Sequence, residues 1–484
     1  MDLKKLKSAH LIGVGGINMS AVAKLLLSAG VHVSGSDLSA NDQTEILAAR
    51  GASIYIGEAP ENIPQDCELV ITTSAAPVAN KERIAAAERR IPEMTNFAFL
   101  GKWFAEAKTF VVAGTHGKST TTAMLGLILE RAGLDPTVIV GSKVPTFTDG
   151  NLRLGKSDLF VIEGDEYAKH FLEFKADGVI LNNLELDHTD VFTNIENLLL
   201  SFHELVGQVK DGGIVVVNIS DARLAGLIET EWEALNGRGI KIVTFGLATG
   251  ATLASEESGD AWSVSSRQTA ELHAVRLNRN ETQHDFNLHV IGEFNAMNAA
   301  AAALLAEAVG ASWQDITAAL ESFKGIWRRF EFLEDRQGAL IYSDYGHHPT
   351  AVSATLKAAR TAFPDKRIVL CFQPHHRNRT KILFLDFVPS FDLADVLVLG
   401  EIYEVSGRDD EPDKDISSRD LLDALARHDA SREAKRVLEF GGAIAAAVKR
   451  TLELSVAGDL VIFMGAGDID AELHKALAEG RREE

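Results

Sequence analysis

A short glycine-containing turn, Gly114-Thr115-His116-Gly117-Lys118-Ser119, has the residue types and spacing of a phosphate-binding loop. The apolar run 109–113 before it is typical of a strand, and the residues after it, up to 131, are typical of a helix. In such a turn the backbone N–H groups surround phosphate oxygens, Lys118 supplies a positive charge, and the Ser119 hydroxyl can bind Mg²⁺. Because Val112 stands where the usual loop has its first glycine, the sequence predicts a shortened nucleoside-triphosphate loop.

Acidic residues and a histidine follow two further expected strands. They are Glu163, Asp165 and Glu166 after the strand at 159–162, and Glu185, Asp187 and His188 after the strand at 178–182. Taken singly, they could be loop charges in contact with solvent. The carboxyl ends of parallel strands meet at one edge of a sheet. With a phosphate loop in the same region, the pattern therefore favours a two-metal nucleotide site that has Glu163 and His188 as ligands.

A second glycine-rich turn, Gly13-Val14-Gly15-Gly16-Ile17-Asn18, lies between an expected strand and an expected helix near the N-terminus. It is similar to a dinucleotide-binding fingerprint, except that Asn18 occupies the place of the last glycine. Asp37 follows roughly 20 residues later, where such folds place a ribose-binding acid. The turn predicts a diphosphate at a helix N-terminus but does not identify the ligand. A nicotinamide-dependent oxidoreductase is the alternative that this turn would favour.

Two polar segments in the last third of the chain, 344–349 (DYGHHP) and 373–380 (QPHHRNRT), each follow an expected strand. Histidine and arginine at this density suit the recognition of carboxylate or phosphate groups. The alternative is a salt-bridged interface between two loops. The segment 327–330 (WRRF) could be a linker packed by its aromatic residues, or it could carry an arginine that reaches a phosphate from another domain.

The alternation of expected strands and helices divides the chain into three α/β units. We expect a Rossmann-like domain at 1–106, a central P-loop domain at 107–324 and a second Rossmann-like domain at 325–484. The polar, alternating stretch 251–283 favours antiparallel strands within the central domain. A length of 484 residues agrees with about three domains.

The amino-acid composition limits the kinds of binding partner and the cellular compartment that we expect for this protein. The net charge is -21 and its acidic residues are interspersed with basic ones, which argues against nucleic acid or an anionic membrane as partner. Only Cys67 and Cys371 are present, far apart, as in proteins of a reducing compartment. The sequence has no apolar run near the roughly 20 residues of a membrane span. We therefore expect a cytoplasmic protein, either a monomer or a homodimer.

Taken in order, the motifs resemble the Mur ligases of peptidoglycan synthesis across nearly the whole chain. The blocks that carry the resemblance are 114–122 (GTHGKSTTT), 163–166 (EGDE), 182–188 (NNLELDH), 292–302 (GEFNAMNAAAA) and 344–350 (DYGHHPT). The resemblance implies a UDP-sugar-binding domain, a central ATPase domain and a C-terminal domain that binds the amino acid. It also implies ATP and Mg²⁺ as cofactors, and ligation through an acyl phosphate.

The resemblance also implies roles for individual residues. For ATP these are Gly114, Thr115, His116, Gly117, Lys118, Ser119 and Thr120 at the phosphates, Asn295 and Asn298 at the adenine, Asp344 at the ribose, and Arg329 from the domain junction. For Mg²⁺ they are Ser119, Glu163 and His188. For the UDP-sugar they are Gly13, Gly15, Gly16, Ser20, Asp37 and Ser74. For the incoming amino acid they are Tyr345, His348, His376 and Arg379. Lys118, Glu163, His188 and His348 would take part in catalysis, His348 as a proton acceptor by residue type alone.

Two branches of the family share most of these blocks, one adding L-alanine to UDP-N-acetylmuramate and the other adding a murein tripeptide in recycling. Residues 372–380 and 401–419 resemble the alanine-adding branch, whereas 165–167 and 182–185 resemble the tripeptide-adding branch. Because the C-terminal domain delivers the amine, we expect UDP-N-acetylmuramate and L-alanine as substrates. His376 stands where arginine is frequent, which bears on how the amino-acid carboxylate is held. A P-loop protein that binds nucleotide without ligation is the remaining alternative.

Overall fold

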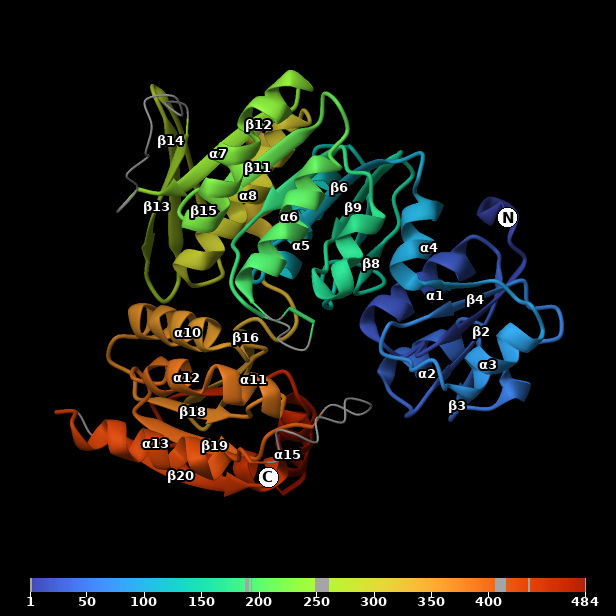
Figure 1. The fold of residues 1–484 in the computed structure, drawn as a ribbon. Helices are drawn as coiled ribbons and strands as arrows, with labels where there is room; N and C mark the ends of the chain where they lie inside the picture. The colour runs from blue at the N-terminus through green and yellow to red at the C-terminus, as the bar shows by residue number, and fades with distance from the viewer. Residues whose placement is uncertain are drawn as a thin grey trace.

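Three lobes, each built on its own β-sheet, make up the computed structural model (Figure 1). The structure describes residues 2–187, 191–192, 194–248, 261–404, 415–433 and 436–483. The N-terminal lobe packs against one end of the central lobe through α1 and α4, and the C-terminal lobe lies across another side of the central lobe. The expected α/β fold with three domains is confirmed.

The N-terminal lobe holds a parallel sheet in the order β3-β2-β1-β4-β5. Its elements are η1 (Leu3–Lys5), β1 (Ser8–Ile12), α1 (Ile17–Ser28), β2 (His32–Asp37), α2 (Asp42–Ala49), β3 (Ser53–Ile56), η2 (Pro60–Asn62), β4 (Leu69–Thr72), α3 (Lys81–Glu88), β5 (Glu93–Thr95) and α4 (Asn96–Trp103). The glycine turn after β1 therefore lies at the carboxyl edge of this sheet, beside the ends of β2 and β4.

The central lobe holds a larger sheet in the order β15-β14-β13-β12-β11-β10-β6-β9-β7-β8. Its elements are β6 (Lys108–Ala113), α5 (Lys118–Arg131), β7 (Thr137–Ile139), β8 (Leu152–Arg153), β9 (Leu159–Glu163), η3 (Tyr167–Glu173), β10 (Gly178–Leu181), α6 (Ile195–Gly207), β11 (Ile214–Asn218), α7 (Ala222–Gly237), β12 (Lys241–Leu247), β13 (Trp262–Gln268), β14 (His273–Arg279), β15 (Thr282–Leu288), α8 (Glu293–Ala308) and α9 (Trp313–Ser322). Strands β6, β9 and β10 are parallel neighbours, so the loops that follow them meet at one edge.

The C-terminal lobe has a sheet in the order β16-β17-β21-β18-β19-β20, parallel except for β16. Its elements are β16 (Glu331–Arg336), β17 (Ala339–Asp344), α10 (Pro349–Ala362), β18 (Ile368–Phe372), α11 (Arg377–Ile382), α12 (Phe384–Ser390), β19 (Val396–Gly400), α13 (Ser418–Ala430), β20 (Val437–Gly442), α14 (Ile444–Leu454), β21 (Leu460–Met464) and α15 (Ile469–Glu483). The loops after β17 and β18 lie at the edge that faces the central lobe.

Local sequence explains the elements that hold the nucleotide loop. Strand β6 is apolar and buried along almost its whole length, as a central parallel strand must be. Gly117 has a φ of 82° at the start of α5, a backbone conformation that L-residues other than glycine rarely adopt. Helix α8 carries a run of buried alanines, 299–303, and these small side chains let it pack closely against α5.

One segment of the central lobe, the connection 140–151 between β7 and β8, contacts both other lobes. Lys143 forms an ion pair of 3.1 Å with Asp42 in the N-terminal lobe, and its carbonyl oxygen accepts a hydrogen bond from Trp327 N at 2.9 Å in the junction to the C-terminal lobe. Asn151 Oδ1 accepts a hydrogen bond from the buried Lys24 ammonium at 2.7 Å. Polar contacts on this segment therefore tie the central lobe to both neighbours.

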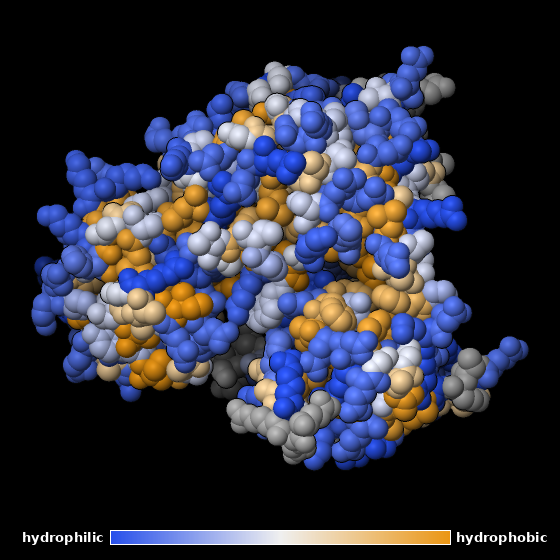
Figure 2. Space-filling view, turned by 180° about the vertical axis from the view of Figure 1, so that it is seen from behind, coloured by the Kyte–Doolittle hydropathy of each residue, from blue (hydrophilic) through white to orange (hydrophobic). Residues whose placement is uncertain are grey.

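The predicted antiparallel strands are present as β13, β14 and β15, and their antiparallel pairing runs from Ser263 to Leu288. Residues 249–260 of the predicted stretch lie outside the described residues. The sequence did not predict strands β3, β5, β7, β8, β12, β16 and β20. On the face drawn in Figure 2, apolar side chains are interrupted by hydrophilic ones. Within the described ranges, none of the helices combines the length and the apolar character needed to cross a membrane.

Candidate functional site at the junction of the central and C-terminal lobes

A cavity of about 570 Å³ lies between the phosphate loop of the central lobe and α10 of the C-terminal lobe. Residues from both lobes line it. Among the predicted nucleotide residues, His116, Gly117, Thr120, Asn295, Asn298, Arg329 and Asp344 contribute to its wall. Helix α8, the phosphate loop and the end of β17 thus bring together predicted nucleotide residues that are up to 228 positions apart in the sequence (116 to 344). Such a cavity at the carboxyl edge of an α/β sheet is where these folds bind nucleotides.

The phosphate loop is held by the segment that follows β10. Asn183 Oδ1 accepts a hydrogen bond from His116 N at 2.8 Å, and Asn183 Nδ2 donates one to His116 O at 3.0 Å. The Thr115 hydroxyl donates to Glu185 O at 3.0 Å and accepts from Glu185 N at 2.9 Å. Hydrogen bonds in both directions fix the position of this loop relative to the strand beside it.

Lys118 lies inside the turn with its ammonium group surrounded by oxygen atoms. Nζ donates to Gly114 O at 2.7 Å and Thr115 O at 3.1 Å, and it pairs with Glu166 Oε2 at 2.8 Å. Burial alone would lower the pKa of Lys118, but the nearby carboxylates of Glu166 and Glu163 raise it above its ordinary value. Lys118 therefore keeps its positive charge at neutral pH. Burial raises the pKa of the Glu166 carboxyl, although Lys118 opposes that shift.

Ser119 and Glu163 face one another beside Lys118. The Ser119 hydroxyl donates to Glu163 Oε1 at 3.0 Å, and Glu163 Oε2 accepts from Gly141 N at 2.6 Å. A hydroxyl and a carboxylate at hydrogen-bonding distance, both oxygen donors, suit Mg²⁺ as ligands. The predicted third ligand, His188, lies outside the described residues.

The predicted adenine and ribose residues line the cavity from different lobes, the asparagines from α8 and Asp344 from β17. Asn298 Nδ2 donates to Asn295 Oδ1 at 3.2 Å, and a Cβ atom at Gly117 would come within 2.3 Å of Asn298 Oδ1. Asp344 is buried, and its two oxygens accept hydrogen bonds from Gly346 N at 2.7 Å and Phe330 N at 2.8 Å. Burial raises the pKa of Asp344, while nearby Arg329 acts in the opposite direction.

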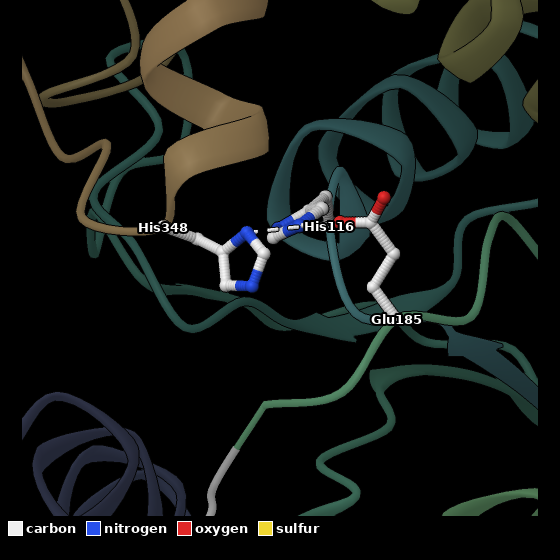
Figure 3. Close-up of side chains that lie close together, drawn as sticks. All are labelled: His116, Glu185 and His348. Carbon is white, nitrogen blue, oxygen red and sulfur yellow. Dashed lines mark hydrogen bonds and ion pairs between the residues drawn. The ribbon is translucent and has the colours of Figure 1, made fainter. Parts of the chain in front are cut away.

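His116, Glu185 and His348 converge where the two lobes meet (Figure 3). His116 Nε2 lies 3.0 Å from Glu185 Oε2, and His348 Nδ1 lies 3.7 Å from the same oxygen. Although burial opposes it, the His116 hydrogen bond lowers the pKa of Glu185, so the carboxylate is ionised. Burial lowers the pKa of His348, and Nε2 of this ring is buried with no hydrogen-bond partner among the described residues. These side chains could hold a divalent cation or pass a proton.

Arg379, predicted to contact the incoming amino acid, reaches across the lobes. Its Nε and Nη2 atoms donate to Asp187 Oδ1 at 2.9 Å and 2.6 Å, and both side chains are buried. His347 Nε2 lies 3.8 Å from the other oxygen of Asp187. Burial, together with the Arg379 charge, lowers the pKa of His347 to about 4. The segments 344–349 and 373–380 therefore both contact Asp187 of the central lobe.

The two other residues predicted for the amino acid lie near this interface. Tyr345 is packed beneath the guanidinium groups of Arg328 and Arg329, 5.0 Å and 5.1 Å from its ring centre. His376 precedes α11 with a φ of 71°, and its backbone N donates to Tyr403 O at 3.0 Å. Their backbone positions are thus fixed by contacts within the C-terminal lobe and its junction.

The N-terminal glycine turn has the form expected of an anion-binding loop. Gly13 has a φ of 79°, and Asp37 Oδ2 accepts a hydrogen bond from Gly15 N at 2.9 Å. Gly16 caps the start of α1, and Ser74 is exposed in the turn after β4. Ser20 differs from these residues, since it is fully buried and its hydroxyl already bonds Ile17 O and Asn151 Nδ2.

Sequence reasoning assigned no role to Asn151, which joins α1 to the central lobe, or to Asn183, which shapes the phosphate loop. An asparagine in a loop is a common turn residue, so the sequence carried no signal for Asn151. Asn183 adjoins the acidic segment 185–187 and could have been singled out by its place after a buried strand.

Models of known protein families match each of the three lobes separately. Family models match residues 8–108 (Mur ligase family, catalytic domain), 112–306 (Mur ligase middle domain) and 328–467 (Mur ligase, glutamate ligase domain). A protein of Clostridium kluyveri named UDP-N-acetylmuramate–L-alanine ligase is 34% identical over 473 residues, 97% of each chain. The chain belongs to the Mur ligase family. The nicotinamide-dependent oxidoreductase and the nucleotide-binding protein without ligase activity are thereby set aside.

Solved structures of Mur ligases agree with this membership. The UDP-N-acetylmuramate–alanine ligase of Thermotoga maritima superposes with a TM-score of 0.81 at 26% identity, covering 99% of this chain and 100% of that one. A murein peptide ligase of Psychrobacter arcticus shares the fold with a TM-score of 0.69 at 23% identity, covering 98% of both chains.

Proposed function

We propose that this Mur ligase joins L-alanine to the lactyl carboxylate of UDP-N-acetylmuramate at the expense of ATP. The observation that carries the proposal is the full-length similarity to a relative that bears this activity in its name. The cavity between the central and C-terminal lobes supports it, because residues of the phosphate loop and of the C-terminal lobe line it together. Ser119 and Glu163, which are paired oxygen ligands, lie next to that loop. Family membership alone leaves the amine open, so the choice of L-alanine is the part that needs testing.

The nucleotide would occupy this cavity. Its phosphates would lie on the turn 114–120, where Lys118 keeps its charge. The backbone N–H groups at the start of α5 could donate hydrogen bonds to the phosphate oxygens. Asn295 and Asn298 offer amide groups for the adenine, and Asp344 offers a carboxylate for the ribose. Arg329 approaches from the C-terminal lobe, so that a bound nucleotide would be held from two lobes.

Ser119 and Glu163 are the residues that would hold Mg²⁺, and we extend the proposal to His188 as a further ligand. Bound Mg²⁺ would neutralise charge on the phosphate oxygens. The protein contributes by holding the Glu163 carboxylate with Gly141 N, which orients one oxygen towards Ser119.

The reaction needs ATP because a carboxylate and an amine do not condense in water. A lactyl carboxylate oxygen attacks the γ-phosphorus, the bond to ADP breaks, and an acyl phosphate forms. The amine nitrogen then attacks the acyl carbon, the bond to phosphate breaks, and the nitrogen loses a proton. His348 is the proposed proton acceptor, since its lowered pKa leaves the imidazole neutral at pH 7.

The flanking lobes would supply the two other substrates. The diphosphate of UDP-N-acetylmuramate would lie on Gly13, Gly15 and Gly16 at the start of α1, with Asp37 and Ser74 nearby. Ser20 remains a proposed contact, although its hydroxyl would have to stop donating to Ile17 O in order to donate to the substrate. The amino acid would enter beside His348 and Arg379, next to Tyr345 and His376.

A reducing cytoplasm is the proposed location. Cys67 and Cys371, the two cysteines, are both free and buried, as is usual where disulfides do not form. The substrates proposed here are precursors with nucleotide groups, which agrees with that location.

Phosphate release tests the proposed function. The purified chain with Mg²⁺ should release phosphate from ATP only when UDP-N-acetylmuramate and L-alanine are both present, and each omission should return the rate to background. Ligation would be refuted if phosphate were released without UDP-N-acetylmuramate and L-alanine. It would also be refuted if no phosphate were released from the complete mixture.

A further inference from the structure

Beneath the N-terminal glycine turn lies a buried polar cluster that the reaction described above does not use. Glu82 at the start of α3 and His10 in β1 are both 0% exposed. Ser34 and Ser36 of β2 and Asn62 of η2 complete this Glu82 cluster and are also buried. Five polar residues from four elements thus meet inside a small lobe.

Both oxygens of Glu82 are engaged. Oε1 accepts from Asn62 Nδ2 at 2.6 Å and from Ala59 N at 3.4 Å, while Oε2 accepts from the Ser36 hydroxyl and lies 3.5 Å from His10 Nε2. The far side of the His10 ring is 2.9 Å from Ser34 Oγ. The carboxylate therefore connects α3 and η2 to the end of β2.

The end of β2 is what shapes the glycine turn. Ser36 O accepts hydrogen bonds from Gly13 N at 2.8 Å and from Val14 N at 3.0 Å. The next residue, Asp37, accepts from Gly15 N at 2.9 Å. A hydroxyl held by Glu82 and a carbonyl that holds the turn thus belong to the same residue, Ser36.

Packing alone does not account for a glutamate at this place. Burial acts to raise the pKa of Glu82, yet the hydrogen bonds from His10, Ser36 and Asn62 lower it below its ordinary value. The side chain is therefore an ion at neutral pH with no access to water. Burying an ion is costly unless donors surround it, whereas an apolar side chain of the same volume would fill the space without that cost.

We propose that Glu82 is a positioning residue for the UDP-substrate, acting through Ser36 on the backbone of the turn at residues 13–16. This inference rests on the proposed function, because it takes that turn as the diphosphate site. Glu82 touches no substrate itself. Its hydrogen bonds hold Ser36, whose carbonyl oxygen fixes Gly13 and Val14 and thereby the start of α1. The first N–H groups of that helix have no partner within the helix and can bind a diphosphate, so binding requires less reorganisation.

The test is the Glu82→Gln variant of the full chain, which keeps the shape of the side chain but replaces one acceptor by an N–H donor facing other donors. Glu88→Gln on the exposed face of the same helix is the matched control. Titration calorimetry measures the Kd for UDP-N-acetylmuramate and, separately, for a non-hydrolysable ATP analogue. We expect the first Kd to rise by about tenfold in Glu82→Gln, with the second unchanged and Glu88→Gln like the wild type.

Steady-state kinetics adds a readout that a merely structural role would not move. In Glu82→Gln the KM for the UDP-substrate should rise while kcat at saturation and the KM for ATP stay near those of the wild type. If Glu82→Gln does not fold, Ser36→Ala decides instead, since it keeps the carbonyl but removes the hydroxyl, and it should weaken binding in the same direction.

Two negative results are distinguishable. A wild-type chain that does not bind UDP-N-acetylmuramate would contradict the proposed function. A wild type that binds it, with equal Kd for the folded Glu82→Gln variant, would overturn the positioning role alone. Equal losses for the UDP-substrate and the ATP analogue would also overturn it, because they would indicate general destabilisation.

Discussion

At the scale of single residues, the positively charged Lys118 lies inside the turn that we propose binds the phosphates of ATP. Two carbonyl oxygens and the Glu166 carboxylate surround its ammonium group. These contacts compensate the charge of the ammonium group. Phosphate oxygens can take the place of the carbonyl oxygens without the lysine changing its protonation, since its pKa is raised.

Replacing Lys118 by alanine should abolish ligation and leave UDP-substrate binding intact. We expect kcat to fall by at least about a hundredfold, because a charge directed at the transferred phosphoryl group is lost in a site with little water. The phosphate-release assay measures the rate, and calorimetry measures the Kd for UDP-N-acetylmuramate. Lys108→Ala, an exposed lysine on the strand before the turn, is the control. Loss of UDP-substrate binding in Lys118→Ala would show that the two sites are not separate.

His347 should make the interface between the lobes sensitive to acid. Its pKa is lowered to about 4 in the folded chain, against an ordinary value near 6.5, because burial disfavours the charged ring. Between these values the unfolded chain binds a proton that the folded chain does not, so stability falls as the pH falls from about 6.5 towards about 4. Between pH 7 and pH 5, the thermal unfolding midpoint should fall less in His347→Gln than in the wild type.

The control for this comparison is His474→Gln, which replaces an exposed histidine on α15. Its thermal unfolding midpoint should change with pH by the same amount as that of the wild type. An identical pH dependence in His347→Gln and the wild type would mean that the ring is not held neutral at the interface.

At the scale of elements, α11 connects the C-terminal lobe to the segment after β10. The buried Arg379–Asp187 contact is bidentate on the arginine side, a geometry that fixes orientation as well as distance. Asp187 occupies the Nε–H group and one N–H of Nη2, so an amino-acid carboxylate would have to use the remaining N–H groups of Arg379 or replace Asp187.

Arg379→Ala should weaken the use of L-alanine far more than the binding of ATP. We expect kcat/KM for L-alanine to fall by about a hundredfold, since the change removes carboxylate donors and leaves the buried Asp187 charge unpaired. The Kd of an ATP analogue should change by less than about threefold. The control is Lys381→Ala, an exposed cation on the same helix. A larger loss for the ATP analogue than for L-alanine would assign Arg379 to the nucleotide instead.

The sequence predicted the elements that carry strong local patterns and failed where contacts are distant. Strand β6, the glycine turn and α5 form a contiguous apolar run, turn and helix, so local pattern was sufficient. Strand β20 has a weakly apolar, half-buried sequence and was missed. The pairing of Arg379 with Asp187 spans 192 positions, and the engagement of Ser20 by Asn151 spans 131. Neither leaves a local signal, because each depends on how whole lobes meet.

At the scale of the molecule, the proposed site is incomplete in any single lobe. The phosphate loop and the oxygen donors belong to the central lobe, Asp344, His348 and Arg379 to the C-terminal lobe, and the glycine turn to the N-terminal lobe. An acyl phosphate is hydrolysed by water, so a site formed by the approach of lobes can exclude water while the amine attacks. The segment 140–151 forms polar contacts with both flanking lobes and can therefore fix their positions relative to the central lobe.

The choice of amine is the central claim, and one competition measures it. Wild-type chain, ATP, Mg²⁺ and UDP-N-acetylmuramate are mixed with equal concentrations of L-alanine and murein tripeptide, and the UDP-linked products are separated by mass. We predict the L-alanine adduct in excess by at least about tenfold, because a pocket built for one methyl group would have no room for the longer peptide. A product dominated by the tripeptide adduct would contradict the account and would leave only the ligase chemistry standing.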